Sequence, residues 1–174
     1  ESLIDIGKAL QRISSKYFID IYSTEKRNKI LKYLINENGI KFHGAISYDD
    51  VKKIILGSDI LIHTESFSKN IINKIKYSIS TKIADSLASG TCLFAYGPED
   101  IASIEYLKEH NAACVVTKPR KLESTLKELI NNYDLRRSYV KNALELANMN
   151  HNGKKNSEAF KILIANTLEP YKYK

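Results

Sequence analysis

The chain alternates between short β-branched apolar runs and longer segments whose apolar positions recur at helical spacing. The short runs predict strands, at 17–22, 40–43, 59–63, 92–96 and 112–116. The longer segments predict helices, at 2–15, 23–36, 47–57 and 81–89, and one that follows a turn at 97–100 and runs through residue 110. Strands separated by helices of about ten residues are typical of βαβ units. We therefore predict a single α/β domain over residues 1–174, with a parallel sheet.

Two regions depart from this alternation. Residues 64–80 form the longest connection and predict an irregular stretch, which in a compact domain is usually functional or disordered. Beyond Pro119 the pattern predicts three helices, which break near Asn131 and again at 150–153. We expect the last of them, from Lys154, to pack back on the domain with its lysines in water.

Composition narrows the class of protein. An apolar fraction of 43% in 174 residues indicates a folded domain, and no apolar stretch approaches the ~20 residues that cross a bilayer. Cys92 and Cys114 each lie in an apolar run, as buried thiols do, and no Cys-x-x-Cys or His-Glu-x-x-His motif supports a metal site. The chain begins at Glu1 without a secretory signal, and its one methionine is Met149. We interpret it as an excerpt of a longer, cytoplasmic protein.

The charge is basic, with 27 Lys+Arg against 20 Asp+Glu and a formal net charge of +7. The lysines are dispersed among acidic residues in predicted helices, which is typical of a solvated surface. Dispersed charge without a recognition motif does not favour a domain that binds nucleic acid. A basic face would attract either a phosphate-bearing ligand or an anionic membrane surface, and the charge alone does not choose between them.

The candidate catalytic and binding residues lie near the carboxyl ends of the predicted strands, because parallel sheets bind ligands there. Glu65 directly follows the third strand. At the end of the long connection, Ser80, Thr81 and Lys82 place two hydroxyls and an ammonium group at a helix start, where free N–H groups favour anions. Asp85 lies one turn further, where a carboxylate can accept bonds from sugar hydroxyls. The alternative is that a hydroxyl caps this helix and that the two charged side chains are solvated neighbours.

Two histidines, His43 and His63, end predicted strands at the same edge. Each is either a sugar contact or general base, or a packed and hydrogen-bonded histidine, and the sequence leaves both interpretations open. Tyr96 ends the fourth predicted strand and either flanks a ligand or precedes a Gly-Pro turn.

Several motifs follow one another in a familiar order. They are Phe42-His43-Gly44, Ser58-Asp59-Ile60-Leu61-Ile62, Lys82-Ile83-Ala84-Asp85-Ser86-Leu87-Ala88-Ser89-Gly90 and Leu93-Phe94-Ala95. This order resembles the C-terminal half of GT-B glycosyltransferases, in the large retaining group often called family 4 or group 1. The resemblance covers nearly the whole chain, and Leu-Ala-Ser-Gly before a buried strand is its most specific part. It implies a Rossmann-like donor domain, with helices on both faces of its sheet, of a hexosyltransferase that builds bacterial surface polysaccharide or lipopolysaccharide.

The resemblance also implies roles for particular residues. The diphosphate of a UDP- or GDP-linked sugar would lie at Ser80, Thr81 and Lys82. Asp85 would contact the ribose. The residues near the base or the sugar would be His43, Gly44 and Ser78. No metal or other cofactor is implied.

The chain departs from the family at several points. The family's Glu-x7-Glu signature would begin at Tyr77, where no acid stands, and Asp85 replaces its second Glu. We expect Glu65 to approach the donor sugar instead, as the catalytic candidate. The family's first strand and its acceptor-binding N-terminal domain are expected upstream of Glu1. This chain is therefore expected to bind the donor without catalysing transfer by itself, in the cytoplasm or peripheral to the inner face of the membrane.

A non-enzymatic flavodoxin-like or receiver-like module that binds phosphate or a nucleotide is the alternative. A receiver domain carries an acidic cluster and a phosphorylatable Asp at its strand ends. Asp59 begins its predicted strand instead of ending it, which weighs against a receiver.

Overall fold

The computed structural model describes residues 1–24 and 39–168 of the chain. The strands in these residues match the predicted ones to within two residues at each end, and all pair in parallel. They are β1 (Ile19–Tyr22), β2 (Ile40–Gly44), β3 (Ile60–Thr64), β4 (Cys92–Tyr96) and β5 (Cys114–Val116). The helix predicted over 23–36 falls almost wholly outside the described residues.

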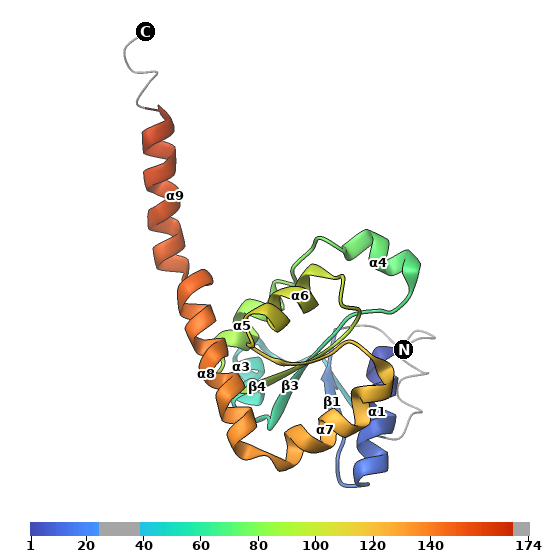
Figure 1. Cartoon of the computed structure of the whole chain (residues 1–174). Coiled ribbons are helices and arrows are strands. Elements are labelled where there is room, and N and C mark those ends of the chain that lie inside the picture. Colours follow the sequence, from blue (N-terminus) through green and yellow to red (C-terminus); the bar gives the residue numbers. More distant parts are fainter. Residues whose placement is uncertain (25–38, 169–174) are drawn as a thin grey trace.

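The helices before, between and after these strands give the α/β architecture that the sequence predicts (Figure 1). They are α1 (Ser2–Ile13), α3 (Tyr48–Gly57), α4 (Lys69–Ile75), α5 (Lys82–Ala88), α6 (Ala102–Glu109), α7 (Leu122–Asn131), α8 (Tyr133–Asn150) and α9 (Gly153–Leu168). A short 3-10 helix, η1 (Pro119–Lys121), precedes α7. The three helices predicted beyond Pro119 are thereby confirmed.

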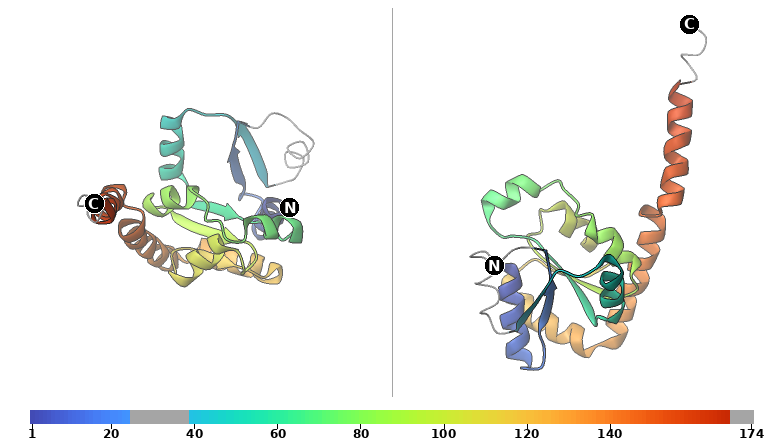
Figure 2. Two further views of the ribbon diagram at one scale, coloured as in Figure 1. Left: turned by 90° about the horizontal axis from the view of Figure 1, so that it is seen from above. Right: turned by 180° about the vertical axis from the view of Figure 1, so that it is seen from behind.

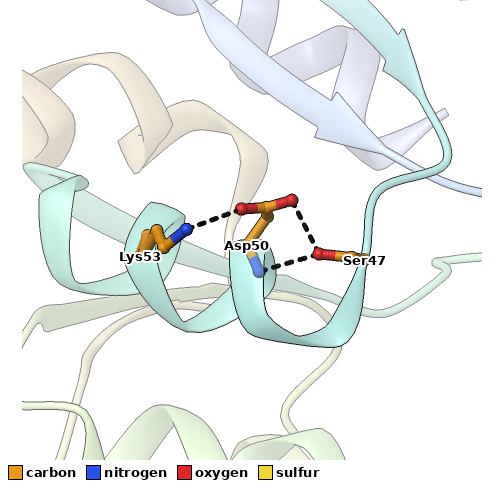
Figure 3. A network of polar contacts seen from close by, with 3 residues as sticks. All are labelled: Ser47, Asp50 and Lys53. Carbon is orange, nitrogen blue, oxygen red and sulfur yellow. Dashed lines mark hydrogen bonds and ion pairs between the residues drawn. The ribbon is translucent and has the colours of Figure 1, made fainter.

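α3 begins at a side-chain cap supplied by Ser47. Ser47 Oγ accepts the backbone N–H of Asp50 at 3.2 Å and donates to its carboxylate at 2.6 Å (Figure 3). Lys53 Nζ approaches the same carboxylate at 3.0 Å. The hydrogen bond from Ser47, followed by that from Lys53, lowers the pKa of Asp50. Two contacts on one side chain therefore fix the first turn of α3.

The five strands are divided between two sheets. β1 pairs with β2, whereas β3, β4 and β5 form a separate sheet with β4 in the middle. In this second sheet Ile60 lies opposite Cys92, and Thr64 lies opposite Tyr96. Within residues 1–24 and 39–168, no strand pairing joins the two sheets. The expected single sheet is therefore corrected to two parallel sheets.

The core lies on both faces of β4, which is buried at every position. One face packs with α1 and α7, and the other packs with α5, α6 and α8. Helices on both faces explain why β4 is a continuous apolar run instead of an alternating one. Burial raises the pKa of Cys92 to about 11 and that of Cys114 to about 12. Both thiols are free and buried, as predicted.

α1 contacts both sheets. At its start, Ser2 Oγ donates to the backbone oxygen of Glu65, at the carboxyl end of β3, over 2.7 Å. Further along, Gly7 touches Gly39, where β2 begins: a Cβ on Gly39 would lie 2.6 Å from the Gly7 oxygen. Gly39 also has a φ of +86°, so the approach and the backbone both require glycine. α1 therefore ties together two sheets that no strand pairing joins in the part of the chain that the structure describes (Figure 2).

Two expectations about helical segments are wrong. The connection 64–80 is not irregular throughout, because it contains α4, whose Ile72 and Ile75 pack against the core face of α5 and α6. The last helix does not pack back on the domain. α9 has no buried residue and extends away from the body (Figure 1). Across the described residues, no helix has the length and hydropathy needed to cross a membrane.

Candidate functional site

Glu65 continues β3 by one residue at the carboxyl edge of the three-stranded sheet. Its N–H donates to the Tyr96 oxygen at 2.9 Å, and its own oxygen accepts the Ser2 hydroxyl. Its Cβ lies beside Gly97, where an added Cβ would approach to 2.7 Å. Contacts from α1, β4 and the turn after β4 therefore fix Glu65 at the edge where parallel sheets bind ligands.

The carboxylate of Glu65 is paired with His63. Glu65 Oε1 lies 3.1 Å from His63 Nε2, and the two side chains are only 14% and 13% exposed. The His63 nitrogen makes no hydrogen bond of good geometry in the described structure. Residues two apart in extended backbone share a face, so strand geometry brings the pair together. The pair is therefore an ion-pair contact by distance, which places a carboxylate and an imidazole side by side at the edge of the sheet.

His43 is a hydrogen-bonded histidine at the end of β2. Its Nε2 lies 2.5 Å from Asp20 Oδ1, and its ring stacks on Tyr22 with 4.7 Å between the centroids. Gly44, the next residue, has a φ of +79° and accepts the N–H of Ser23 at 2.9 Å. Both partners of the His43 side chain belong to β1. Pairing of β1 with β2 therefore positions His43, whose side chain is hydrogen-bonded and stacked but remains 41% exposed.

The segment between α4 and α5 is anchored to α6. Ser103 is fully buried, and its hydroxyl donates to the Ser78 oxygen and accepts the Ser80 N–H, each at 3.1 Å. The N–H of Ala102 donates to the Lys76 oxygen at 2.7 Å. These bonds hold the backbone of 76–80 against the start of α6. The Ser80 amide is therefore already engaged, which leaves its hydroxyl as the group available to a ligand.

The residues that follow face solvent. Thr81, Lys82 and Asp85 are exposed, and Thr81 makes no side-chain capping bond at the start of α5. Tyr77, at the position where the family signature would begin, is 89% exposed. Among the described residues, no hydrogen bond or ion pair joins this segment to Glu65 or His43. The structure thus brings Glu65 and His63 together and keeps the α5 start as a separate group.

A cavity that the sequence did not reveal lies between α1 and η1. It has a volume of about 360 Å³ and is lined by residues that include Asp5, Tyr96 and Arg120. Arg12 Nε and Glu123 Oε2, also in the lining, pair at 2.6 Å. Burial, with the nearby Asp5 charge, raises the pKa of Tyr96 to about 12. The sequence held one indication of this cavity. Residues 119–121 follow the carboxyl end of the fifth strand, and parallel sheets bind ligands at that edge.

No group of three or more His, Cys, Asp or Glu side chains in residues 1–24 and 39–168 is arranged to hold a metal ion.

Comparison with known proteins identifies the family. The family model described as glycosyl transferase-like matches residues 8–161. The chain belongs to this glycosyl transferase-like family. No curated protein matches the chain.

Two solved structures resemble the fold. WaaG, a glycosyltransferase involved in lipopolysaccharide biosynthesis, aligns over 83% of this chain with a TM-score of 0.62 and 14% identity. The α,α-trehalose 6-phosphate synthase from Burkholderia multivorans aligns over 97%, with a TM-score of 0.58 and 10% identity. The chain spans 38% of the WaaG chain and 41% of the synthase chain. The fold is that of the C-terminal-like domain of a GT-B glycosyltransferase.

Proposed function

We propose that this chain is the part of a retaining glycosyltransferase that binds the nucleotide-sugar donor. The observation that carries the proposal is the placement of Glu65, held at the carboxyl edge of a parallel sheet beside His63. Membership of the glycosyl transferase-like family supports the reaction class. Transfer to an acceptor is proposed for the whole enzyme, together with an acceptor domain outside this chain.

The donor is a UDP- or GDP-linked sugar in this proposal. Ser80, Thr81 and Lys82 would bind its diphosphate, and Asp85 would bind its ribose. An exposed ammonium group beside a helix start would stabilise the charge that develops on a departing nucleoside diphosphate. Ser78 and the β2 end at His43 and Gly44 would lie near the base or the sugar. No metal is needed for these roles.

Glu65 is proposed to act at the sugar in place of the acid that is missing at Tyr77. The Glu65 side chain is only 14% exposed, so little water competes for its carboxylate. A sugar that contacts the carboxylate would therefore meet a fixed negative charge. His63 would hold that carboxylate in position. We propose bacterial surface polysaccharide or lipopolysaccharide as the product, as in the biosynthesis in which WaaG takes part. The place of action is the cytoplasm or the inner face of the membrane, where the basic surface would meet anionic lipid.

The donor site is tested by calorimetric titration with UDP, GDP and their sugars. We expect Lys82→Ala to weaken binding of the preferred nucleoside diphosphate by about tenfold or more, because a charge-assisted bond is worth about 1.5–3 kcal/mol. The matched control is Lys141→Ala, an exposed lysine on α8. Equal affinity in the two variants would show that Lys82 does not bind the nucleotide. If no nucleotide binds the chain, the proposed function is wrong.

The role of Glu65 is tested by comparing a nucleotide with its sugar conjugate. We expect Glu65→Gln to weaken binding of the nucleotide sugar but not of the nucleoside diphosphate, because the carboxylate is proposed to contact only the sugar. Equal losses for both ligands would mean that the substitution disturbs the edge of the sheet instead. Circular dichroism of the variant checks that the fold is intact.

A further inference from the structure

The cavity between α1 and η1, which we call the α1–η1 cavity, lies apart from the proposed donor site. Tyr96 and Leu122 in its lining belong to the core that α1 and α7 share on one face of the three-stranded sheet. α5, whose start is proposed to bind the donor diphosphate, packs on the opposite face. A ligand in this cavity would therefore be a different ligand from that diphosphate.

The α1–η1 cavity has a buried floor and a charged rim. Tyr96 and Leu122 are buried, whereas Lys8, Arg12 and Arg120 are exposed. The volume of about 360 Å³ lies within the range of roughly 300–1,000 Å³ that is usual for small-molecule sites. Such sites combine apolar walls with a few polar groups that orient the ligand. The cavity therefore has the size and the kind of lining that a small molecule requires.

The charges around the cavity do not balance. Arg12 and Glu123 pair at 2.6 Å, so each offsets the charge of the other. The remaining charged side chains of the lining are Lys8, Arg120 and Asp5, which are two cations and one acid. In the part of the chain that the structure describes, the Arg120 guanidinium has no hydrogen bond or ion pair. An excess of positive charge, with a guanidinium that no protein group engages, favours an anionic ligand.

The lining favours a phosphate monoester that also carries hydroxyl groups. A guanidinium donates two parallel bonds to a phosphate or a carboxylate. The second cation, Lys8, favours the phosphate monoester, which carries a charge of about −1.5 to −2 near pH 7. Asp5 would repel the phosphate, but a carboxylate accepts hydrogen bonds from hydroxyl groups. The buried ring of Tyr96 would lie against the carbon skeleton.

We propose that the α1–η1 cavity binds a small hydroxylated phosphate monoester, with the phosphate at Lys8 and Arg120 and hydroxyl groups facing Asp5. It is a second ligand site, on the face of the sheet opposite α5. The proposal does not depend on the proposed function, because none of these side chains is assigned to the donor.

The test is calorimetric titration of the 174-residue chain with three probes at one ionic strength. Mannose 6-phosphate carries both the phosphate and the hydroxyls, inorganic phosphate carries only the first, and mannose carries only the second. We expect mannose 6-phosphate to bind at least tenfold more tightly than either of the other probes. Equal affinity for inorganic phosphate would contradict the part of the proposal that concerns hydroxyl groups.

Two substitutions test the placement of the ligand. We expect Arg120→Ala to weaken binding of mannose 6-phosphate by about tenfold or more, because it removes a charge-assisted contact. The matched control is Arg137→Ala, an exposed arginine on α8, which should leave the affinity unchanged. Asp5→Asn should instead strengthen binding of inorganic phosphate, because it removes a negative charge from the cavity.

Lys82→Ala separates this site from the proposed donor site and should leave the affinity for mannose 6-phosphate unchanged. The inference is wrong if none of the three probes binds, or if Arg120→Ala and Arg137→Ala bind mannose 6-phosphate equally well. It is also wrong if Lys82→Ala loses as much affinity as Arg120→Ala. A chain that binds UDP or GDP but not mannose 6-phosphate would overturn this inference and leave the proposed function intact.

Discussion

Tyr96 is the largest side chain that the structure buries completely, and its hydroxyl makes no hydrogen bond of good geometry. Asp5 lies close to it across the α1–η1 cavity, and burial raises the pKa of that carboxyl. A buried polar group without a partner costs about 1–3 kcal/mol. The Asp5 carboxylate is close enough to couple with this hydroxyl and to contribute to the shift in both pKa values. Tyr96 therefore gives up stability only as far as its hydroxyl is poorly aligned with Asp5.

We expect Tyr96→Phe to leave the free energy of unfolding unchanged or to raise it by up to about 1 kcal/mol, because it removes a buried hydroxyl that is poorly aligned with its neighbour Asp5 and leaves the ring unchanged. Urea denaturation measures the change. The control is Tyr106→Phe, whose hydroxyl lies 2.9 Å from His151 Nε2 and accepts a bond from Asn150. That variant should lose about 0.5–1.5 kcal/mol. A comparable loss at Tyr96 would show that its hydroxyl is bonded in solution.

Asp50 gives a pH-dependent prediction. Its pKa is lowered in the folded chain, so its stabilisation is complete above the ordinary value of 3.8 and is lost as the pH falls through the lowered value. We expect Asp50→Asn to lower the melting temperature at about pH 6 and to have little effect at about pH 2. Asp49→Asn, in the same turn but without these contacts, is the control. A deficit in Asp50→Asn that is the same at both pH values would contradict the assignment.

Among the elements, the turn after β4 is packed directly against the end of β3. An added Cβ on Gly97 would meet Glu65 at 2.7 Å and the Ile104 side chain at 3.1 Å. Both neighbours are themselves held, Glu65 by its backbone bonds and Ile104 in the core. The spacing of β3 and β4 at their carboxyl ends therefore depends on the absence of a side chain at this position.

We expect Gly97→Ala to lower the free energy of unfolding by about 1–3 kcal/mol, because neither neighbour can move freely. Gly57→Ala, at the end of α3, is the matched control, since nothing lies within 4 Å of its Cβ position. That change should be neutral or slightly stabilising. Thermal denaturation of both variants decides the matter. Equal melting temperatures would mean that the turn adapts to a methyl group.

Local periodicity was enough to predict most elements, because strands and helices differ in their apolar spacing. It missed α4, where Ile71, Ile72 and Ile75 have helical spacing but stand among polar residues in a short segment. It also missed the division into two sheets. Which strand lies beside which depends on contacts distant in sequence, and no local pattern encodes them.

The candidate site was predicted in part for the same reason. Glu65 could be found because it follows a recognisable strand, and its pairing with His63 follows from the two-residue repeat of extended backbone. The anchoring of Ser78 and Ser80 could not be found, because it depends on a buried hydroxyl at Ser103 far along the chain. The partners of His43 come from β1 and required the strand pairing.

At the scale of the whole molecule, α9 is set apart from the rest. It has no buried residue, and its large apolar side chains are exposed. These are Phe160, Ile162, Leu163, Ile164 and Leu168. The stability of the α/β body should therefore owe little to this helix.

We expect a chain that ends at Asn152 to melt within about 2 °C of the full chain, because the removed helix buries no apolar surface. Differential scanning calorimetry on dilute samples measures the difference. A chain that ends at Asn132, which removes the buried α8 residues Ala143, Leu146 and Ala147, is the control and should be strongly destabilised. A large drop on removal of α9 alone would show that it packs on the body in solution.

The double attachment of α1 has a consequence for how the protein opens. Since α1 contacts both sheets and no strand pairing joins them within the described residues, detachment of this one helix would leave only the shared apolar core to hold the described β1–β2 pair to the remaining domain. Local unfolding of α1 and of β1–β2 should then occur as one cooperative event, while β3, β4 and β5 stay folded. The boundary between the two sheets would then be the part of the described structure that opens most easily.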